Sequence, residues 1–289
     1  MRILIQEKVL QAVEILNEKN IDMWLTFVRE TAVNPDPILP TIYGEASLTR
    51  PSALIIQRNG ECIAIVARMD EECARQTGAY SRVLRSDAAI SSLLLETLQR
   101  YNPASIAINT SMHNVLADGL SYGMYQRLLE ILKGTPFAGR LIAAEEIIAA
   151  LNGRKLPSEV QRLQAAVADT ESIYAATYDF LKAGLTEKDV AHFMHEQIAQ
   201  RGLDSAWVYA GCPAVNSGPD SPVGHAVPTD IILEHGHIVH FDFGVKKDGY
   251  CSDIQRVVYL LKPGEHSAPL PVQQGFAVVR QAVEASRAA

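Results

Sequence analysis

An alternation of apolar and polar residues around position 240 constrains the fold of this chain more than any other feature. Between residues 238 and 245 every second side chain is apolar, which is typical of a β-strand with one buried face; the apolar side chains are Val239, Phe241, Phe243 and Val245. The segment 246–249 ends in Asp-Gly, a pair that readily adopts the positive φ angles of a tight turn, and extended character resumes over residues 250–260. The sequence therefore predicts a β-hairpin.

Two aspartates of this hairpin, Asp242 and Asp253, lie eleven residues apart. A two-residue loop at Lys247-Asp248 would place them directly opposite each other, whereas a loop at Asp248-Gly249 would make them diagonal neighbours, and both registers put both carboxylates on one face. Directly opposed side chains lie roughly 4.5–5.5 Å apart at Cβ, and like charges at this distance are destabilising unless a cation lies between them. Such a pair could hold two divalent ions about 3.5–4 Å apart. Alternatively, both aspartates are solvated on an exposed face, but the apolar opposite face favours a hairpin that lies in a core.

Composition and charge exclude several classes of protein. The 289 residues suffice for two domains, and a net charge of −7 without a Lys/Arg cluster argues against a nucleic-acid partner. Four scattered cysteines without a CxxC pair fit a reducing compartment. No stretch reaches the length of a membrane span, and the first twenty residues lack the apolar region of a signal peptide. We therefore expect a cytoplasmic protein without a membrane partner.

The first 150 residues have the pattern of a mixed α/β domain. Asn59-Gly60 between two apolar runs is a strong hairpin signal. The expected helices are 5–16, 91–101 and 122–132, and the expected strands are 23–28, 52–57, 62–67 and 105–109.

Helix-breaking and charged residues at 152–157 indicate a domain boundary. Ser158 and Gln161 have the spacing of a capping box, which predicts a long helix from there to about residue 182. Thr186 and Asp189 repeat this spacing and predict a second helix that ends near Gly202. A loop, a strand, the hairpin and a last helical pattern from about residue 272 complete the chain.

Two histidines are candidates for function. His225 lies in a Gly/Pro/Ser-rich loop leading towards the Asp242 strand, where a histidine can donate a proton or bind substrate beside a metal. His240 shares the strand face of Asp242 and could support the site as a partner of its ligands.

The other histidines have simpler interpretations. His235 and His237 flank Gly236 in a segment that we expect to be a solvated turn. His192 and His195 lie three residues apart on the second helix, but alanine stands where a zinc-protease helix needs its second histidine, so a polar helix face is expected.

Four segments between residues 212 and 256 resemble the pita-bread metallopeptidases, the group of aminopeptidase P, prolidase and methionine aminopeptidase that shares its fold with creatinase. The segments are 212–218 (CPAVNSG), 224–228 (GHAVP), 242–245 (DFGV) and 248–256 (DGYCSDIQR). The resemblance implies an α+β fold, in which an incomplete pita-bread catalytic domain at residues 153–289 follows a smaller creatinase-like α/β N-terminal domain at residues 1–152.

The same resemblance implies a metal centre and a substrate. The family holds two divalent ions (Mn, Co or Zn) with two aspartates, a histidine and two glutamates, and the ions activate a bridging water that attacks the scissile carbonyl. Asp242 and Asp253 match the two aspartates, the second contacting both ions, and His225 matches the histidine that contacts the substrate. The implied substrate is a small peptide with proline after the cleaved bond, and the implied assembly is a homodimer.

The sequence departs from the family pattern after Asp253. The remaining histidine and both glutamates of the family lie on strands beyond Ala289, and Glu265, His266 and Glu284 lack the corresponding motifs. Two of five ligands are expected to hold a binuclear centre weakly, so we interpret the chain as an incomplete copy of a metallopeptidase.

Two other functional classes remain open at this stage. One is a creatinase-like or lyase-like enzyme acting on a small non-peptide substrate. The other is a metal-free pita-bread module that binds peptides or proteins. Metal content distinguishes the binding module from the enzymes, and a panel of dipeptides distinguishes a peptidase from a lyase.

Overall fold

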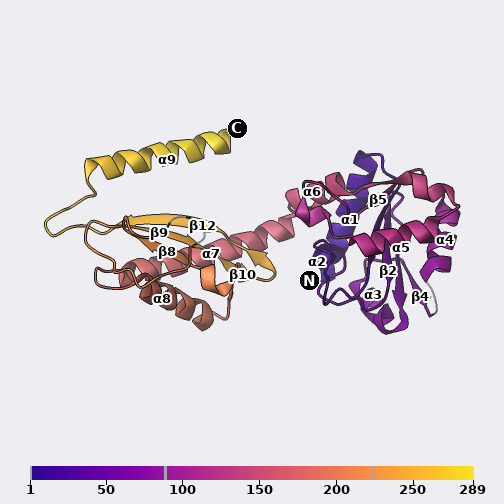
Figure 1. The fold of residues 1–289 in the computed structure, drawn as a ribbon, viewed down its shortest axis with the longest axis horizontal. Helices are drawn as coiled ribbons and strands as arrows, with labels where there is room; N and C mark the ends of the chain where they lie inside the picture. Colours follow the sequence, from indigo (N-terminus) through magenta and orange to yellow (C-terminus); the bar gives the residue numbers. More distant parts are fainter. Residues whose placement is uncertain (1, 88–89, 223, 225) are drawn as a thin grey trace. The chain divides into compact units, whose positions relative to one another are not determined.

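The chain forms two units, each with its own hydrophobic core. The computed structural model describes residues 2–289 except 88–89, 223 and 225, and divides the chain into Met1–Ser158 (unit 1) and Glu159–Ala289 (unit 2). Figure 1 labels helices and strands in both units.

Unit 1 is built on a mixed sheet with the strand order β4-β3-β2-β1-β5-β6. The pairs β1–β2 and β2–β3 are antiparallel, whereas β3–β4, β1–β5 and β5–β6 are parallel. The bounds of the strands are β1 Met23–Val28, β2 Ser52–Gln57, β3 Cys62–Ala67, β4 Arg82–Ser86, β5 Ile106–Ile108 and β6 Leu141–Ala143. The bounds of the helices are α1 Arg2–Glu18, α2 Leu39–Ile42, α3 Glu71–Thr77, α4 Ile90–Tyr101, α5 Tyr122–Leu132 and α6 Glu145–Gly153, with 3₁₀ turns at Arg68–Asp70, Val115–Ala117 and Pro136–Arg140.

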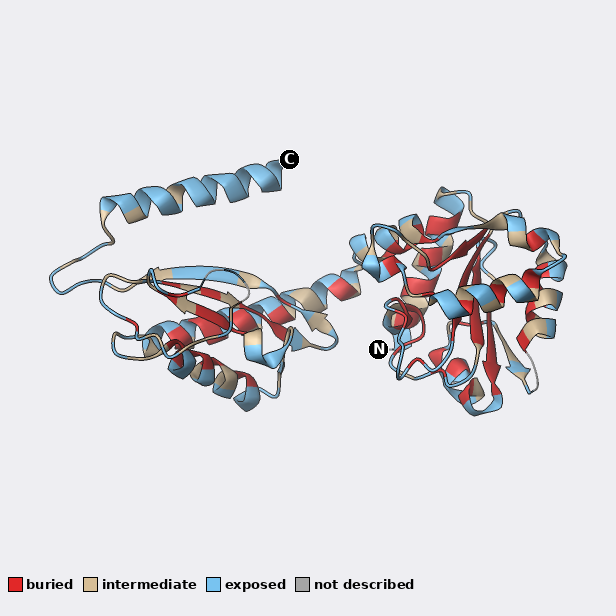
Figure 2. Cartoon of the chain, in the orientation of Figure 1, coloured by how far each residue is buried: buried red, intermediate tan, exposed pale blue. Residues whose placement is uncertain are grey.

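Helices cover both faces of this sheet, which explains why its central strands are apolar throughout. Trp24 and Leu54 pack into a core with α1, α2 and α6, whereas their neighbours Leu25 and Ile55 pack into a second core with α4 and α5. Figure 2 shows the central strands as continuously buried. The strands expected at 52–57 and 62–67 and the helix expected at 122–132 are confirmed to the residue.

Unit 2 contains two small sheets packed against two helices. The sheets have the strand orders β12-β9-β8 and β11-β10-β7. The helices are α7 Pro157–Phe180, α8 Glu187–Gln200 and α9 Leu270–Ala288, and a 3₁₀ turn lies at Tyr209–Gly211. The strands are β7 Asp204–Ser205, β8 Ala214–Ser217, β9 Ile238–Phe243, β10 Val245–Lys247, β11 Tyr250–Cys251 and β12 Ile254–Tyr259.

The alternation that predicted a half-buried strand is confirmed in β9. Val239, Phe241 and Phe243 are fully buried, while His240 and Asp242 are partly exposed on the opposite face. The rings of Phe241 and Phe243 each form a T-shaped pair with the ring of Tyr174 of α7, at centroid distances of 5.9 and 5.7 Å. The buried face of the strand is therefore fixed by aromatic packing, and the polar face is left for chemistry.

The structure decides between the two hairpin registers. Asp248 and Gly249 both have positive φ angles, 49° and 83°, and form the two-residue loop, so Lys247 pairs with Tyr250 and Asp242 pairs with Gln255. The two aspartates are accordingly diagonal neighbours. The extended segment expected over residues 250–260 consists of two strands, β11 and β12, because the chain leaves the ladder at Ser252-Asp253.

One of the two predicted capping boxes is confirmed. The Thr186 side chain accepts from the backbone N–H of Asp189, and the Asp189 side chain accepts from the backbone N–H of Thr186. The capping box predicted at Ser158 is wrong, because α7 already begins at Pro157 and the Ser158 hydroxyl donates to the Glu7 carboxylate (2.8 Å) instead.

The last helix, α9, exposes apolar side chains. None of its residues is buried, and Phe276, Val279 and Val283 are each more than half exposed. Across the residues that the structure describes, no helix combines the length and the apolar character needed to span a membrane.

The four cysteines are free and differ in accessibility. Cys73 and Cys251 are exposed, whereas Cys62 and Cys212 are buried. Burial raises the pKa of the Cys62 thiol to about 11 and also raises the pKa of Cys212. Because the thiolate is the reactive form, we expect a disulfide reagent such as DTNB at about pH 8 to label two thiols in the native protein and four after denaturation. Replacing Cys73 and Cys251 with serine should remove the native labelling, and a buried thiol that reacts at once would contradict the fold.

Candidate metal and peptide site

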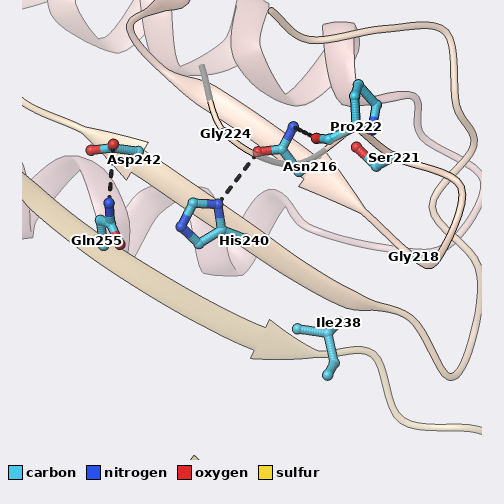
Figure 3. A pocket seen from close by; sticks show the side chains of 9 residues that line it. All are labelled: Asn216, Gly218, Ser221, Pro222, Gly224, Ile238, His240, Asp242 and Gln255. Atoms are coloured by element: carbon cyan, nitrogen blue, oxygen red, sulfur yellow. Dashed lines mark hydrogen bonds between the residues drawn. The ribbon is translucent and has the colours of Figure 1, made fainter. Parts of the chain in front are cut away.

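The two aspartates of the hairpin face each other across the polar side of unit 2. Partial burial, together with the nearby Asp242 carboxylate, raises the pKa of Asp253. Asp242 Oδ2 accepts a hydrogen bond from the side-chain amide of Gln255 (3.1 Å) on β12, as Figure 3 shows. Asp242 Oδ1 is buried and has no hydrogen-bond partner among the described residues. Asp242 Oδ1 is thus a hydrogen-bond acceptor that is shielded from solvent and accepts no hydrogen bond from the described residues.

The segment that carries Asp253 is held by α7 on both sides of the aspartate. The Ser252 hydroxyl lies 2.6 Å from Thr170 Oγ1 and accepts from the backbone N–H of Val245 (2.9 Å). The Tyr174 hydroxyl donates to the carbonyl of Ile254 (2.7 Å). Since Thr170 and Tyr174 lie one helical turn apart, α7 fixes the residue before Asp253 and the residue after it. Asp253 itself is exposed, but its backbone is anchored.

A cavity of about 490 Å³ opens beside Asp242. One wall is formed by the sheet, through Asn216 of β8, Ile238 and His240 of β9, and Gln255 of β12. The loop after β8 forms the other wall, and its lining residues are Gly218, Ser221, Pro222 and Gly224. The hydroxyl of Ser221 is buried and, like Asp242 Oδ1, has no partner among the described residues. The cavity therefore combines apolar lining residues, Ile238 and Pro222, with two polar groups that are available to bind a ligand, the Ser221 hydroxyl and Asp242 Oδ1.

His240 lies in this cavity rather than behind it. The Asn216 amide donates to the Pro222 carbonyl (3.2 Å), and its Oδ1 faces His240 Nδ1 at 3.4 Å (Figure 3). Since Oδ1 can only accept, Nδ1 carries the proton, and in the neutral ring Nε2 is left as an acceptor. His225, the predicted catalytic histidine, falls outside the described residues.

Two expectations about the other histidines need correction. His237 is not a solvated turn residue: its ring is half-buried, and Nδ1 accepts from the backbone N–H of Glu234 (3.2 Å) and lies 3.2 Å from Ser217 Oγ. His195 does not lie on a purely polar helix face, because its ring stacks on Tyr209 and Nε2 contacts the Cys212 carbonyl (2.8 Å). Both rings contact residues of other elements, and the spacing of the histidines along the sequence does not reveal these contacts.

Several residues of the site were not predicted from the sequence. Gln255 directly follows the aspartate segment, and its position opposite Asp242 becomes evident only when the Asp248-Gly249 register is known. Thr170 and Ser252 are 82 residues apart, so no local pattern connects them. Asn216 and His240 are directly opposite each other in the pairing of β8 with β9. A prediction of this strand pairing would have found Asn216.

The donor set fits a divalent cation. Carboxylate oxygens are preferred ligands of hard divalent ions, and a cation would satisfy the unpaired Asp242 Oδ1 while relieving the repulsion that contributes to the raised pKa of Asp253. Within the part of the chain that the structure describes, no three His, Cys, Asp or Glu side chains converge as a metal site. The two aspartates thus supply part of a coordination shell.

Solved structures with the same arrangement of elements identify the fold. The Xaa-Pro dipeptidase from Bacillus anthracis aligns with a TM-score of 0.69 and 18% identity, covering 96% of this chain and 70% of that chain. The fold is that of the pita-bread peptidases, with the preceding α/β unit, and the predicted fold class is confirmed.

Sequence similarity points to the same group of enzymes. Residues 161–289 match the profile of metallopeptidase family M24. It is 28% identical to the "Xaa-Pro dipeptidase" of Lactobacillus helveticus over 149 residues, which are 51% of this chain and 39% of that protein. It is 33% identical to a "Putative Xaa-Pro aminopeptidase" of Mycoplasma genitalium over 103 residues, which are 35% of this chain and 28% of that protein. The matches thus span less than half the length of these relatives.

Proposed function

We propose that this protein is a metal-dependent peptidase that hydrolyses Xaa-Pro bonds at the N-terminus of peptides or in dipeptides. The observation that carries the proposal is the pair Asp242 and Asp253, which face each other beside a cavity of about 490 Å³ and leave one buried carboxylate oxygen unpaired. Two relatives, an Xaa-Pro dipeptidase and a putative Xaa-Pro aminopeptidase, support the substrate class.

The two aspartates would hold divalent ions, with Mn, Co or Zn as the candidates. When bound, such ions supply a Lewis acid and an activated water for attack on the scissile carbonyl. The amide of Gln255 donates to Asp242 Oδ2, so Oδ1 is the oxygen of Asp242 that would be available to a cation. His225 is proposed to contact the substrate. A homodimer and a cytoplasmic location stay predictions.

The lining of the cavity suits a small substrate that is largely apolar around the bond to be cleaved. Pro222 and Ile238 offer apolar surface, whereas the Ser221 hydroxyl and the Nε2 acceptor of His240 can bind peptide groups. Burial of polar peptide groups requires such partners, because an unpaired buried donor or acceptor costs about 1–3 kcal/mol.

A peptide panel tests the proposal. The protein is incubated with Ala-Pro, Ala-Pro-Ala and the matched peptides with alanine in place of proline, with added manganese, cobalt or zinc and separately with EDTA. We expect release of the first residue from the proline peptides only, dependent on metal and abolished by EDTA. Metal binding without hydrolysis, or hydrolysis that persists in EDTA, would contradict the proposed function. The ratio of activities on Ala-Pro and Ala-Pro-Ala separates a dipeptidase from an aminopeptidase.

A further inference from the structure

A buried carboxylate outside the aspartate pair joins two segments that are distant in the sequence. Glu187, the first residue of α8, is fully buried. Its Oε1 accepts from the backbone N–H of Ser217 (2.7 Å), and its Oε2 accepts from the backbone N–H (2.9 Å) and the hydroxyl (2.7 Å) of Thr229. A single side chain thus binds both ends of the loop 217–229.

Three hydrogen-bond donors satisfy the buried side-chain oxygens of Glu187. Among the described residues, no cation forms an ion pair with Glu187. Burying an ionised carboxylate is costly unless hydrogen bonds compensate it, and bonds to a charged acceptor are roughly twice as strong as neutral ones. The position at the N-terminus of α8 adds the favourable helix dipole. The carboxylate and its three donors therefore form one interdependent unit.

The loop that Glu187 holds is the wall of the cavity beside Asp242. Gly218, Ser221, Pro222 and Gly224 belong to this loop and line the cavity. Ser217 ends β8, the edge strand of its sheet, so without Glu187 its N–H would have no partner on that side. Removal of the carboxylate would leave the Ser217 and Thr229 N–H groups, one at each end of the wall, without their acceptor, while the backbone bonds Gly218 N–H to Ile238 and Lys188 N–H to Thr229 would remain.

We infer that Glu187 is a positioning residue that fixes the loop wall of the peptide cavity relative to Asp242. Within the described part of the chain, the side-chain hydrogen bonds of Glu187 go to Ser217 and Thr229 and not to Asp242 or Asp253. Its effect on peptide binding rests on the proposed function, whereas its effect on the loop does not.

The test compares Glu187→Gln with wild type by hydrogen exchange, metal titration and steady-state kinetics. Glutamine keeps the shape but replaces one acceptor oxygen with a donor, so one of the two backbone N–H groups loses its partner. We expect amide exchange at Ser217 and Thr229 to become at least about tenfold faster. Manganese affinity should stay within about twofold of wild type, while KM for Ala-Pro-Ala rises by about tenfold with a smaller change in kcat.

Two further variants make the test specific. Thr229→Val removes the hydroxyl bond to Oε2 and the bond that the hydroxyl accepts from the Ile231 N–H (3.2 Å), but it keeps both backbone bonds to Glu187. It should give an intermediate effect on exchange at Ser217 and Thr229. Lys188→Ala breaks the exposed ion pair between Lys188 and Asp230 next to the same loop and should change neither exchange at Ser217 nor KM. If Glu187→Gln folds poorly, the comparison of Thr229→Val with Lys188→Ala still tests the positioning role.

The possible outcomes separate the two proposals. Unchanged exchange at both amides in Glu187→Gln would overturn the positioning role, and so would a parallel loss of metal affinity and hydrolysis, which would indicate general unfolding. If the wild-type protein hydrolyses no peptide, the proposed function fails, and the exchange measurement still decides whether Glu187 fixes the loop.

Discussion

Asp253→Asn is expected to abolish metal-dependent hydrolysis of Xaa-Pro peptides and to weaken manganese binding strongly. Asparagine keeps the size of the side chain but removes the charge that faces Asp242, so the site loses half of its anionic donors. A metal ion contributes several kcal/mol to the transition state, and losing about 4 kcal/mol lowers kcat/KM by about a thousandfold. Calorimetric titration and the Ala-Pro-Ala assay measure the two effects.

The hairpin offers a matched control for this substitution. Asp248 is an exposed aspartate of the same hairpin and occupies the first loop position, with φ 49°. Asp248→Asn removes the same charge and preserves the turn, because Asn-Gly favours this loop as well as Asp-Gly does. Asp248→Asn should behave like wild type in both measurements. Undiminished turnover by Asp253→Asn, or equal losses in the two variants, would contradict the metal-ligand role.

Gly244→Ala is expected to destabilise unit 2 more than any other glycine substitution in the hairpin. A Cβ atom at Gly244 would lie 1.9 Å from the carbonyl oxygen and 2.7 Å from the carbonyl carbon of Ser252. These are backbone atoms, and Ser252 is further fixed by Val245 and Thr170, so neither strand can yield without breaking these hydrogen bonds. We expect a loss of about 3 kcal/mol in the free energy of unfolding.

The same substitution should also disturb the metal site. Asp253 follows Ser252 directly, so separating the strands at Gly244 moves its carboxylate away from Asp242. Urea unfolding and manganese titration of the folded variant measure stability and affinity separately.

Gly249→Ala is the control for Gly244→Ala. Gly249 has φ 83° but no atom within 4 Å of an added Cβ, so alanine there costs only the backbone strain, about 1 kcal/mol. A Gly244→Ala protein no less stable than Gly249→Ala would show that the strands separate more easily than the contacts of Ser252 indicate.

Local patterns predicted most of the elements because the relevant interactions are local. The period of two in β9, the Asn59-Gly60 turn and the capping box of Thr186 each depend on residues fewer than ten positions apart. The prediction at Ser158 was wrong because a distant residue, Glu7, competes for the same hydroxyl. A short-range signal decides the structure only where no long-range partner offers a better bond.

The sequence by itself determined that Asp242 and Asp253 share one face of a hairpin, since both possible loops give this result. Only the tertiary structure decided the register, because the positive φ angles of Asp248 and Gly249 select one of two loops that the sequence allows equally. The tertiary structure likewise decided which residues support the pair. Thr170 and Tyr174 of α7 and Glu187 of α8 reach the site through contacts with residues 30 to 82 positions away along the chain. Such contacts arise from packing of the helices on the sheet rather than from any local sequence pattern.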